Sequence, residues 1–458
     1  MSQDAQRFGT GTLTCLVFAG MIGAGVFTTS GFTIGALQSP AWVLVAWAVG
    51  GVIAICGAVS YGALARRLPE SGGEYVFLAR GLHPFFGFLA GMVSLTAGFS
   101  GPIALSALTF EEYLLPAAIR PTWWQGGMAA IPVILLCGVG HALHVRLSTR
   151  VQNAVVVLKV AVLLLVLLAA AAVLSSHAWH WESLANANDT ADSFGNASPW
   201  RRAFLFSEQL MWISLSYLGF NAAVYLSSEA REPKRTIPAA LILGTTLVTI
   251  LYVLLNLIFV TAGHPADIAF KPDVAAIAIR QLNGEGFVAQ LLPRIFGINL
   301  ETVLRIAVVL AMFTSVAGGM LIGPRVYARM AADRLFPRFF LAPGHNYRNA
   351  VLLQTALAVP LAAFSSIPNL LNLLGTTLSL CSVLAVTTLF LPLRPTIPQE
   401  KDETAFQLTP PIATCAVCYI LATMTAVIMK FIGNPTELIW MAGAIVVTGA
   451  IHIAARPK

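Results

Sequence analysis

The chain has 458 residues, of which 57% are hydrophobic and only 10% are charged, and its formal net charge is +7. Soluble domains usually carry about 25% charged residues, so the composition excludes an ordinary soluble enzyme or binding module. The basic residues are spread over short loops between apolar stretches rather than gathered in one patch or tail, which argues against a nucleic-acid partner.

Apolar stretches long enough to cross a bilayer follow one another along almost the whole chain. A hydrocarbon core about 30 Å thick needs about 20 apolar residues in each spanning helix, and the spacing predicts twelve spans. They cover, in chain order and approximately, residues 12–36, 40–65, 85–115, 126–145, 151–174, 203–228, 237–262, 301–331, 350–365, 369–391, 411–431 and 436–455. We therefore expect an all-α membrane protein in which residues 1–455 form a single polytopic transmembrane domain.

The distribution of Lys and Arg predicts how the chain is oriented. With the N-terminus inside, 18 of the 27 basic residues fall on the inner side and 8 on the outer side, while Lys159 lies within a span. This asymmetry predicts an even number of spans with both termini in the cytoplasm. We expect an integral protein of the plasma (inner) membrane, surrounded by membrane lipid.

The first span contains three glycines within six residues, in the stretch Gly20-Met21-Ile22-Gly23-Ala24-Gly25-Val26-Phe27. Each glycine weakens a helix by about 1 kcal/mol relative to Ala, and glycine also lets a ligand approach the backbone closely. Two interpretations of this stretch stay open. It is either a packing face of small residues, which is common in membrane helices, or a break in the helix.

The sixth span has a matching central glycine among polar residues, in Ser214-Leu215-Ser216-Tyr217-Leu218-Gly219-Phe220-Asn221. Spans one and six are corresponding members of two five-helix halves, at about 12–174 and 203–391. Interrupted segments at matching positions of two halves indicate the binding site of a transporter. The candidate substrate-binding residues are Ile22, Gly23, Ala24, Gly25 and Val26 in the first span, and Ser216, Tyr217, Leu218, Gly219, Phe220 and Asn221 in the sixth.

Electrostatics explain why two broken helices suit an amino acid. A helix broken at mid-membrane exposes free N–H groups and the positive end of a dipole, which favour a carboxylate. The opposite half-helix offers carbonyl groups to an ammonium group. Because an α-amino acid carries both charges, we predict that an amino acid is the substrate; the alternative is another amine or an amino acid derivative.

Four stretches together resemble one known family of transporters. They are Gly20–Phe27, the loop Arg67-Leu68-Pro69-Glu70-Ser71-Gly72-Gly73-Glu74-Tyr75 with Pro84–Phe88, the segment Gly219-Phe220-Asn221 with Glu229–Pro238, and Pro324–Asp333 with Leu335–Pro337. In this order along the chain they resemble the amino acid–polyamine–organocation (APC) superfamily. The resemblance implies a LeuT-like fold, with five helices, an inverted repeat of five, and two extra helices at about 411–455. It also implies that helices 1 and 6 are broken.

Within that superfamily the chain resembles the L-type amino acid transporter (light-chain) branch. The resemblance rests on Ala107–Tyr113 in span three and on Asn221 directly after Gly219-Phe220. It implies exchange of neutral L-amino acids by alternating access. The branch often has Trp where this chain has Phe220, which puts the size of the pocket in doubt. Animal light chains bond a heavy chain through a Cys in the loop after span three, and residues 116–125 contain none, so we expect no heavy-chain disulfide partner.

Lys159 lies in the middle of the fifth span. An isolated Lys at the membrane centre costs at least about 2.5–3.5 kcal/mol, so this side chain should face the protein interior. The alternative is that it reaches the interface from near a helix end, since Arg150 lies only nine residues earlier. The resemblance implies that its ammonium fills the sodium position of sodium-driven relatives, near the carbonyls of the first broken helix and the hydroxyls of Thr314 and Ser315. Transport would then be sodium-independent exchange, or proton-coupled symport if Lys159 releases its proton.

The remaining polar residues give no sign of a catalytic, metal or cofactor site. Cys415 and Cys418 lack a second Cys pair, and His141 and His144 lack an acidic partner in their motif. The sequence has no HExxH motif and no paired intramembrane aspartates, so we expect no enzyme. A channel usually repeats charged or carbonyl motifs over several subunits, which one long asymmetric chain does not.

Acidic residues bear on the choice of substrate. Glu111 and Glu112 lie towards the outer end of span three and are interpreted as interfacial. No acidic residue is evident beside the break in span six, which favours small or medium neutral substrates over Lys or Arg.

Overall fold

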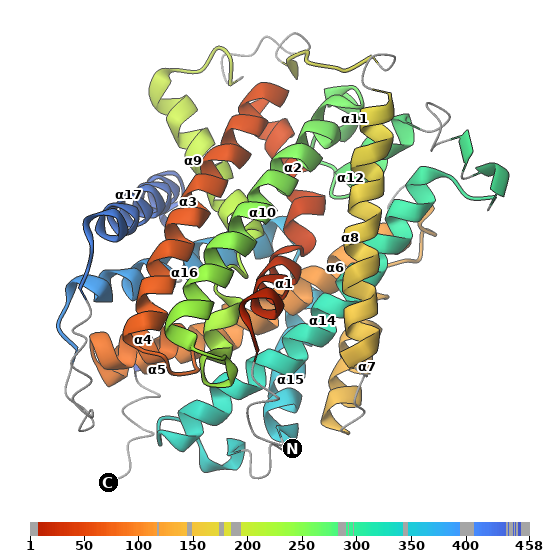
Figure 1. The fold of residues 1–458 in the computed structure, drawn as a ribbon. Coiled ribbons are helices and arrows are strands. Elements are labelled where there is room, and N and C mark those ends of the chain that lie inside the picture. The colour runs from red at the N-terminus through yellow and green to blue at the C-terminus, as the bar shows by residue number, and fades with distance from the viewer. Residues whose placement is uncertain are drawn as a thin grey trace.

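A computed structural model describes residues 8–116, 119–143, 149–173, 178–184, 194–282, 297–341, 347–393 and 407–436, together with single positions among 290–295 and 438–449. Figure 1 shows that the described chain is a bundle of helices, many of them running roughly between the same two ends. Within these residues the structure has no β-strand, and its only strand-like feature is one isolated bridge.

In chain order, the helices are α1 (Thr10–Met21), α2 (Ala24–Leu37), α3 (Pro40–Arg67), α4 (Glu74–Gly81), α5 (Pro84–Val93), the π-helical turn η2 (Ser94–Ser100), α6 (Gly101–Leu114), α7 (Ala130–Ala142), α8 (Thr149–Ala172), α9 (Pro199–Ser216), the 3₁₀ helix η5 (Ala222–Glu229), α10 (Pro233–Thr261), α11 (Pro265–Ile268), α12 (Val274–Gln281), α14 (Leu300–Ala332), η6 (Arg338–Phe340), α15 (Arg348–Phe364), α16 (Ile367–Thr387), η8 (Thr388–Phe390) and α17 (Pro410–Gly433).

Six helical segments are long and apolar enough to cross a membrane, and the bent pair α1 and α2 makes a seventh if it counts as one span. The chain is therefore an integral membrane protein. Three shorter apolar helices and α9 cover four more of the expected spans, and α9 is less apolar because it carries Arg201, Arg202 and Glu208. The last expected span, 436–455, lies mostly outside the described residues. The count of twelve thus stays a prediction.

The start of span one is attached to the segment that follows span six. The Phe8 N–H donates to the Glu229 carbonyl over 3.0 Å, and the Arg231 N–H donates to the Phe8 carbonyl over 2.9 Å. These two bonds form the isolated parallel bridge between Phe8 and Ala230. The two spans expected to form the site are therefore joined near the end of the bundle where the N-terminus lies (Figure 1).

Two of the stretches that carry the family resemblance meet in space. Arg329, near the end of α14, pairs with Glu70 in the loop before α4, with a nitrogen–oxygen distance of 3.1 Å. The Tyr75 hydroxyl donates to the Asp333 carboxylate over 2.7 Å. Residues that lie far apart in the sequence are thus fastened together by an ion pair and a hydrogen bond.

Glu111 is buried against the segment that precedes α7, and its interfacial depth in the membrane stays a prediction. Its carboxylate accepts hydrogen bonds from the backbone N–H groups of Gly127, Ala129 and Ala130, at 2.8–3.1 Å. A fourth donor is the Trp124 indole, at 3.3 Å. The carboxylate of α6 therefore satisfies free N–H groups at the start of α7, where negative charge is favoured. The neighbouring Glu112 side chain instead pairs with Arg120.

We expect Glu111→Gln to lower the free energy of unfolding by about 2 kcal/mol, because charge-assisted hydrogen bonds to a buried group are lost. The Gln amide would also turn an N–H₂ donor towards groups that are themselves donors. The comparison variant is Glu112→Gln, which keeps an acceptor for Arg120 and loses the charge of one ion pair, so it should cost less than Glu111→Gln. Thermal unfolding of both variants in detergent measures the difference, and equal losses would contradict the capping role of Glu111.

Candidate functional site

The first span is interrupted where the sequence predicts. Helix α1 ends at Met21 and α2 begins at Ala24, and the two axes are bent by 41°. Gly23 has an extended backbone, with φ −122° and ψ −158°, and no side chain caps the start of α2. The first N–H groups of α2 consequently have no partner within their own helix. Among the other candidate residues, Ile22, Ala24, Gly25 and Val26 are buried.

The sixth span is interrupted at the matching position. Helix α9 ends at Ser216, Tyr217–Asn221 form turns, and the 3₁₀ helix η5 follows. Gly219 has φ +101°, a backbone conformation that L side chains rarely adopt. A Cβ atom on Gly219 would also lie 2.7 Å from the Gly20 carbonyl oxygen. The interruption of span six therefore packs directly against the end of α1.

A second close approach joins the start of α2 to the end of α9. A Cβ atom on Gly25 would lie 2.6 Å from Ser216 Cα, so only glycine allows this packing. One turn further along α2, Thr29 Oγ1 lies 3.0 Å from Ser216 Oγ in a buried hydrogen bond. The glycines of both interruptions thus serve close packing, while the end of α1 at Met21 and the 41° bend show that the helix is also broken. Both interpretations of the Gly-rich stretch therefore hold.

Tyrosine hydroxyls from neighbouring helices hold the interrupted segments. The buried Tyr252 hydroxyl of α10 lies 2.6 Å from the Met21 carbonyl oxygen and 3.3 Å from that of Ser216, so one phenol bridges both interruptions. The Tyr217 hydroxyl donates to the Trp47 carbonyl of α3 over 3.0 Å. The Tyr252 contacts supply a partner for carbonyl groups that a continuous helix would otherwise satisfy. The Tyr217 contact joins the interruption of span six to α3.

Lys159 of α8 is buried and points at the first interruption. Its ammonium donates to the Ile22 carbonyl over 2.5 Å and to the Ala19 carbonyl over 3.2 Å. The side chain therefore does not reach the interface. The contact with the carbonyls of the first broken helix is the one that the family resemblance implies.

Thr314 and Ser315 stand on α14, and their hydroxyls bond to their own helix. Thr314 Oγ1 lies 3.1 Å from the Leu310 oxygen and 2.9 Å from the Ala311 oxygen, and Ser315 Oγ donates to Ala311 over 2.9 Å. The hydrogen bonds described for Lys159 go instead to Ala19, in the last turn of α1, and to Ile22, the residue after that helix. Each hydroxyl oxygen still has the capacity to accept a further bond.

The structure brings one acidic residue to the break in span six that the sequence analysis missed. Glu74, at the start of α4, is buried and accepts from the Asn221 amide over 2.6 Å. It also accepts from the Tyr61 hydroxyl over 2.9 Å and the Tyr225 hydroxyl over 2.5 Å. The expectation that no acidic residue lies beside this break is wrong, because Glu74 belongs to a loop 147 residues away and only tertiary packing brings it there. Its carboxylate already accepts from three neutral donors.

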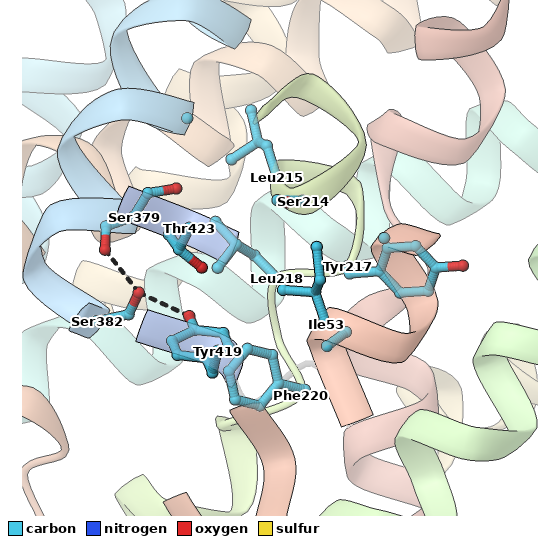
Figure 2. A pocket seen from close by; sticks show the side chains of 13 residues that line it. Ile53, Ser214, Leu215, Tyr217, Leu218, Phe220, Ser379, Ser382, Tyr419 and Thr423 are labelled. Atoms are coloured by element: carbon cyan, nitrogen blue, oxygen red, sulfur yellow. Dashed lines mark hydrogen bonds between the residues drawn. The ribbon is translucent and has the colours of Figure 1, made fainter. Parts of the chain in front are cut away.

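A small pocket of about 20 Å³ lies beside the interruption of span six (Figure 2). Three candidate residues, Tyr217, Leu218 and Phe220, form part of its wall. Figure 2 also shows Ser382 hydrogen-bonded to both Ser379 and Tyr419 on the opposite side. The pocket is therefore mostly apolar with a row of hydroxyl groups. The other lining residues are Gly50, Ile53, Ala54, Ser214, Leu215, Gly375 and Thr423.

The candidate residues of span one do not line this pocket. In the described conformation the start of α2 is instead covered by Ser216. The structure thus brings candidate residues of the two spans into direct contact at Gly25 and Ser216. The pocket described above lies at a different part of span six.

The family model for amino acid permeases matches residues 8–451. The chain belongs to this family. The predicted resemblance is therefore confirmed, and the chain is classed with transporters and not with enzymes. Its similarity extends to the b(0,+)-type amino acid transporter 1 of Mus musculus, at 27% identity over 265 residues, 57% of this chain and 52% of that protein. It also extends to the large neutral amino acids transporter small subunit 2 of Homo sapiens, at 26% identity over 362 residues, 78% of this chain and 62% of that protein.

The chain spans about half the length of the first of these relatives that it matches. Both relatives are amino acid transporters of the light-chain kind, as the stretch Ala107–Tyr113 led us to expect. The region that matches the family model, residues 8–451, includes both interruptions.

We expect Glu74→Leu to destabilise the protein strongly, by on the order of 3 kcal/mol, because it leaves the Asn221 amide and two tyrosine hydroxyls without their buried acceptor. The matched variant Glu74→Gln should cost much less. Its oxygen can still accept from Tyr61 and Asn221, while its amide donates to the Tyr225 oxygen. Thermal unfolding in detergent compares the two, and equal losses would contradict a role based on hydrogen bonding.

Proposed function

We propose that this chain carries amino acids across the membrane by alternating access, without sodium, and that it exchanges neutral L-amino acids. The observation that carries the proposal is the contact between the two interruptions, in which the start of α2 faces the end of α9. We propose the two five-helix repeats and the twelve spans as the frame of this site.

The helix ends support a zwitterionic substrate. The free N–H groups at the start of α2 favour a carboxylate, both by hydrogen bonding and through the helix dipole. The turn at Tyr217–Asn221 provides backbone carbonyls for the substrate ammonium. In this proposal the candidate residues of spans one and six bind the backbone of the amino acid, and the surrounding side chains set the size limit.

Alternating access requires the contact between Gly25 and Ser216 to open and close. The polar part of this contact is a single hydrogen bond between Thr29 and Ser216, at 3.0 Å. A typical hydrogen bond contributes only about 1 kcal/mol net, so its loss is easily offset by contacts to a bound substrate. Phe8 and the Glu229–Arg231 segment, which two backbone hydrogen bonds join, would then move together when this contact opens.

Lys159 supports sodium independence. Its ammonium already donates to the Ala19 and Ile22 carbonyls, and hard cations such as Na⁺ need oxygen ligands of this kind. A fixed positive charge at this place also repels a second cation. Proton-coupled symport is the alternative, and it requires Lys159 to lose its proton during the cycle.

Neutral substrates are favoured because the acidic residue nearest the break, Glu74, is engaged by three donors. The name of the human relative also refers to large neutral amino acids. We propose that the protein works without a disulfide-linked heavy chain, because the segment 116–125 has no Cys.

Uptake and counterflow in proteoliposomes test this function. Purified protein should take up a labelled neutral amino acid only when a neutral amino acid is trapped inside, and competition against a panel of amino acids should identify the preferred side chain. Uptake driven by a proton gradient without internal substrate would favour the symport alternative. Absence of any saturable amino acid uptake would contradict the proposal.

We expect Gly25→Ala to weaken substrate affinity by about tenfold or more, because the added methyl group collides with Ser216 and shifts the start of α2. The matched control is Gly140→Ala in α7, where an added Cβ meets nothing within 4 Å. Scintillation-proximity binding on both variants, after gel filtration has shown that each is folded, makes the comparison. Unchanged affinity in Gly25→Ala would mean that the carboxylate binds elsewhere.

We expect wild-type transport to be the same with and without Na⁺, and Lys159→Ala to weaken substrate affinity by roughly 5- to 150-fold. The variant leaves the Ala19 and Ile22 carbonyls without a donor, which costs about 1–3 kcal/mol for each such group. The effect should differ between the two membrane faces, because the contacts of Lys159 change as α1 moves. Lys271→Ala, at an exposed position, serves as the control. Strict sodium dependence of the wild type, or unchanged kinetics on both faces in the variant, would contradict this role.

A further inference from the structure

Three side chains that could bind a metal ion meet at one end of the bundle. They are His180 and Glu182, in the segment 178–184 after α8, and His264, directly before α11. One ligand atom from each lies within 4.8 Å of the other two. Figure 1 shows α11 near the end of the bundle opposite to the N-terminus, away from the substrate contacts described above.

The chemistry of these side chains is that of a zinc site with an open position. Two imidazoles and one carboxylate are a recurrent set of three protein ligands for Zn²⁺, with water in the fourth position. His264 Nε2 already lies 3.1 Å from Glu182 Oε2. In a tetrahedral site with bonds of about 2.0–2.2 Å, ligand atoms are about 3.3 Å apart. One pair thus has this separation already, and a ligand atom of His180 lies within 4.8 Å of both partners.

The backbone on either side of these residues is held in place. The His180 N–H donates to the Thr261 carbonyl at the end of α10 over 2.8 Å. On the other side, the Ser183 hydroxyl and the Leu184 N–H donate to the Gln38 carbonyl, at 2.7 and 2.9 Å. The segment 178–184 is therefore fastened to α10 and to the end of α2, while the Glu182 and His264 side chains stay exposed to an ion from solution.

An ordinary surface ion pair accounts for the arrangement less well. A pair between His264 and Glu182 needs no third member, and exposed pairs contribute only about 0–1 kcal/mol. The His180 and His264 rings lie with centroids 5.3 Å apart, so both imidazoles are close to the Glu182 carboxylate. A metal ion needs both rings neutral and gives each a ligand bond.

We propose that His180, Glu182 and His264 form a binding site for a divalent transition-metal ion of the Zn²⁺ class, and that the bound ion slows transport. The physical reason for slowing is a cross-link. The segment that begins at His264 packs on α2 through a hydrogen bond of 2.7 Å from the Phe270 N–H to the Gly31 carbonyl. A metal ion that joins this segment to residues 178–184 restrains α2, one of the two half-helices whose separation opens the proposed site.

Zn²⁺ binding to the purified full-length protein tests the site directly. Isothermal titration calorimetry with Zn²⁺ alone should give one site per chain, and Ca²⁺, which prefers oxygen ligands, should not compete. His264→Ala and His180→Ala should each lower the affinity for Zn²⁺ by about tenfold or more. His141→Ala, which removes a histidine of α7, is the matched control and should bind Zn²⁺ like the wild type. Unchanged affinity in both His264→Ala and His180→Ala would overturn the site.

The slowing effect rests on the proposed transport function and has its own readout. Zn²⁺ added to the outer solution of proteoliposomes should reduce amino acid uptake by the wild type and by His141→Ala, but not by His264→Ala. Stoichiometric Zn²⁺ binding with unchanged uptake would overturn the cross-link and leave the site standing. Absence of uptake even without Zn²⁺ would instead contradict the transport function, and calorimetry would still decide the site.

Discussion

A helix broken inside a membrane leaves backbone groups that need hydrogen-bond partners, because hydrocarbon offers none. The rest of this structure depends on how that need is met. The Lys159 ammonium binds the carbonyls of Ala19 and Ile22, and the Tyr252 hydroxyl lies between those of Met21 and Ser216. These two side chains stabilise the break between α1 and α2 by supplying hydrogen-bond partners for its carbonyl groups. No side chain caps the N–H groups at the start of α2.

The same contacts couple the breaks to the surrounding helices. Tyr252 brings in α10, Lys159 brings in α8, and the Tyr217 hydroxyl brings in α3. A movement of α2 away from Ser216 must therefore change the distances that these groups keep. In the proposed transport cycle, these contacts would couple substrate binding to the scaffold. The turn after α9 also forms part of the wall of the pocket beside span six, through Tyr217, Leu218 and Phe220 (Figure 2). A row of hydroxyl groups lines the same pocket.

Buried charges near the site are all engaged, which bears on the choice of substrate. Glu74 accepts from Tyr61, Asn221 and Tyr225, and Lys159 donates to carbonyls only. In the proposed function, a charged substrate side chain would compete with one of these arrangements, and a buried charge without a partner is costly. A neutral side chain has no such cost. The carboxyl and ammonium groups of the amino acid itself then remain the groups to be recognised, by the ends of helices.

The sequence by itself determined the class of this protein, its family and the position of both interruptions. Long apolar stretches and closely spaced glycines affect the local conformation of the chain within a few residues, so they can be interpreted without knowledge of the fold. Only the tertiary structure decided which groups meet. Glu74 reaches Asn221 across 147 residues, Gly25 lies against Ser216, and His264 joins His180 and Glu182. Such pairs depend on how helices pack against one another, which local hydrophobicity does not encode.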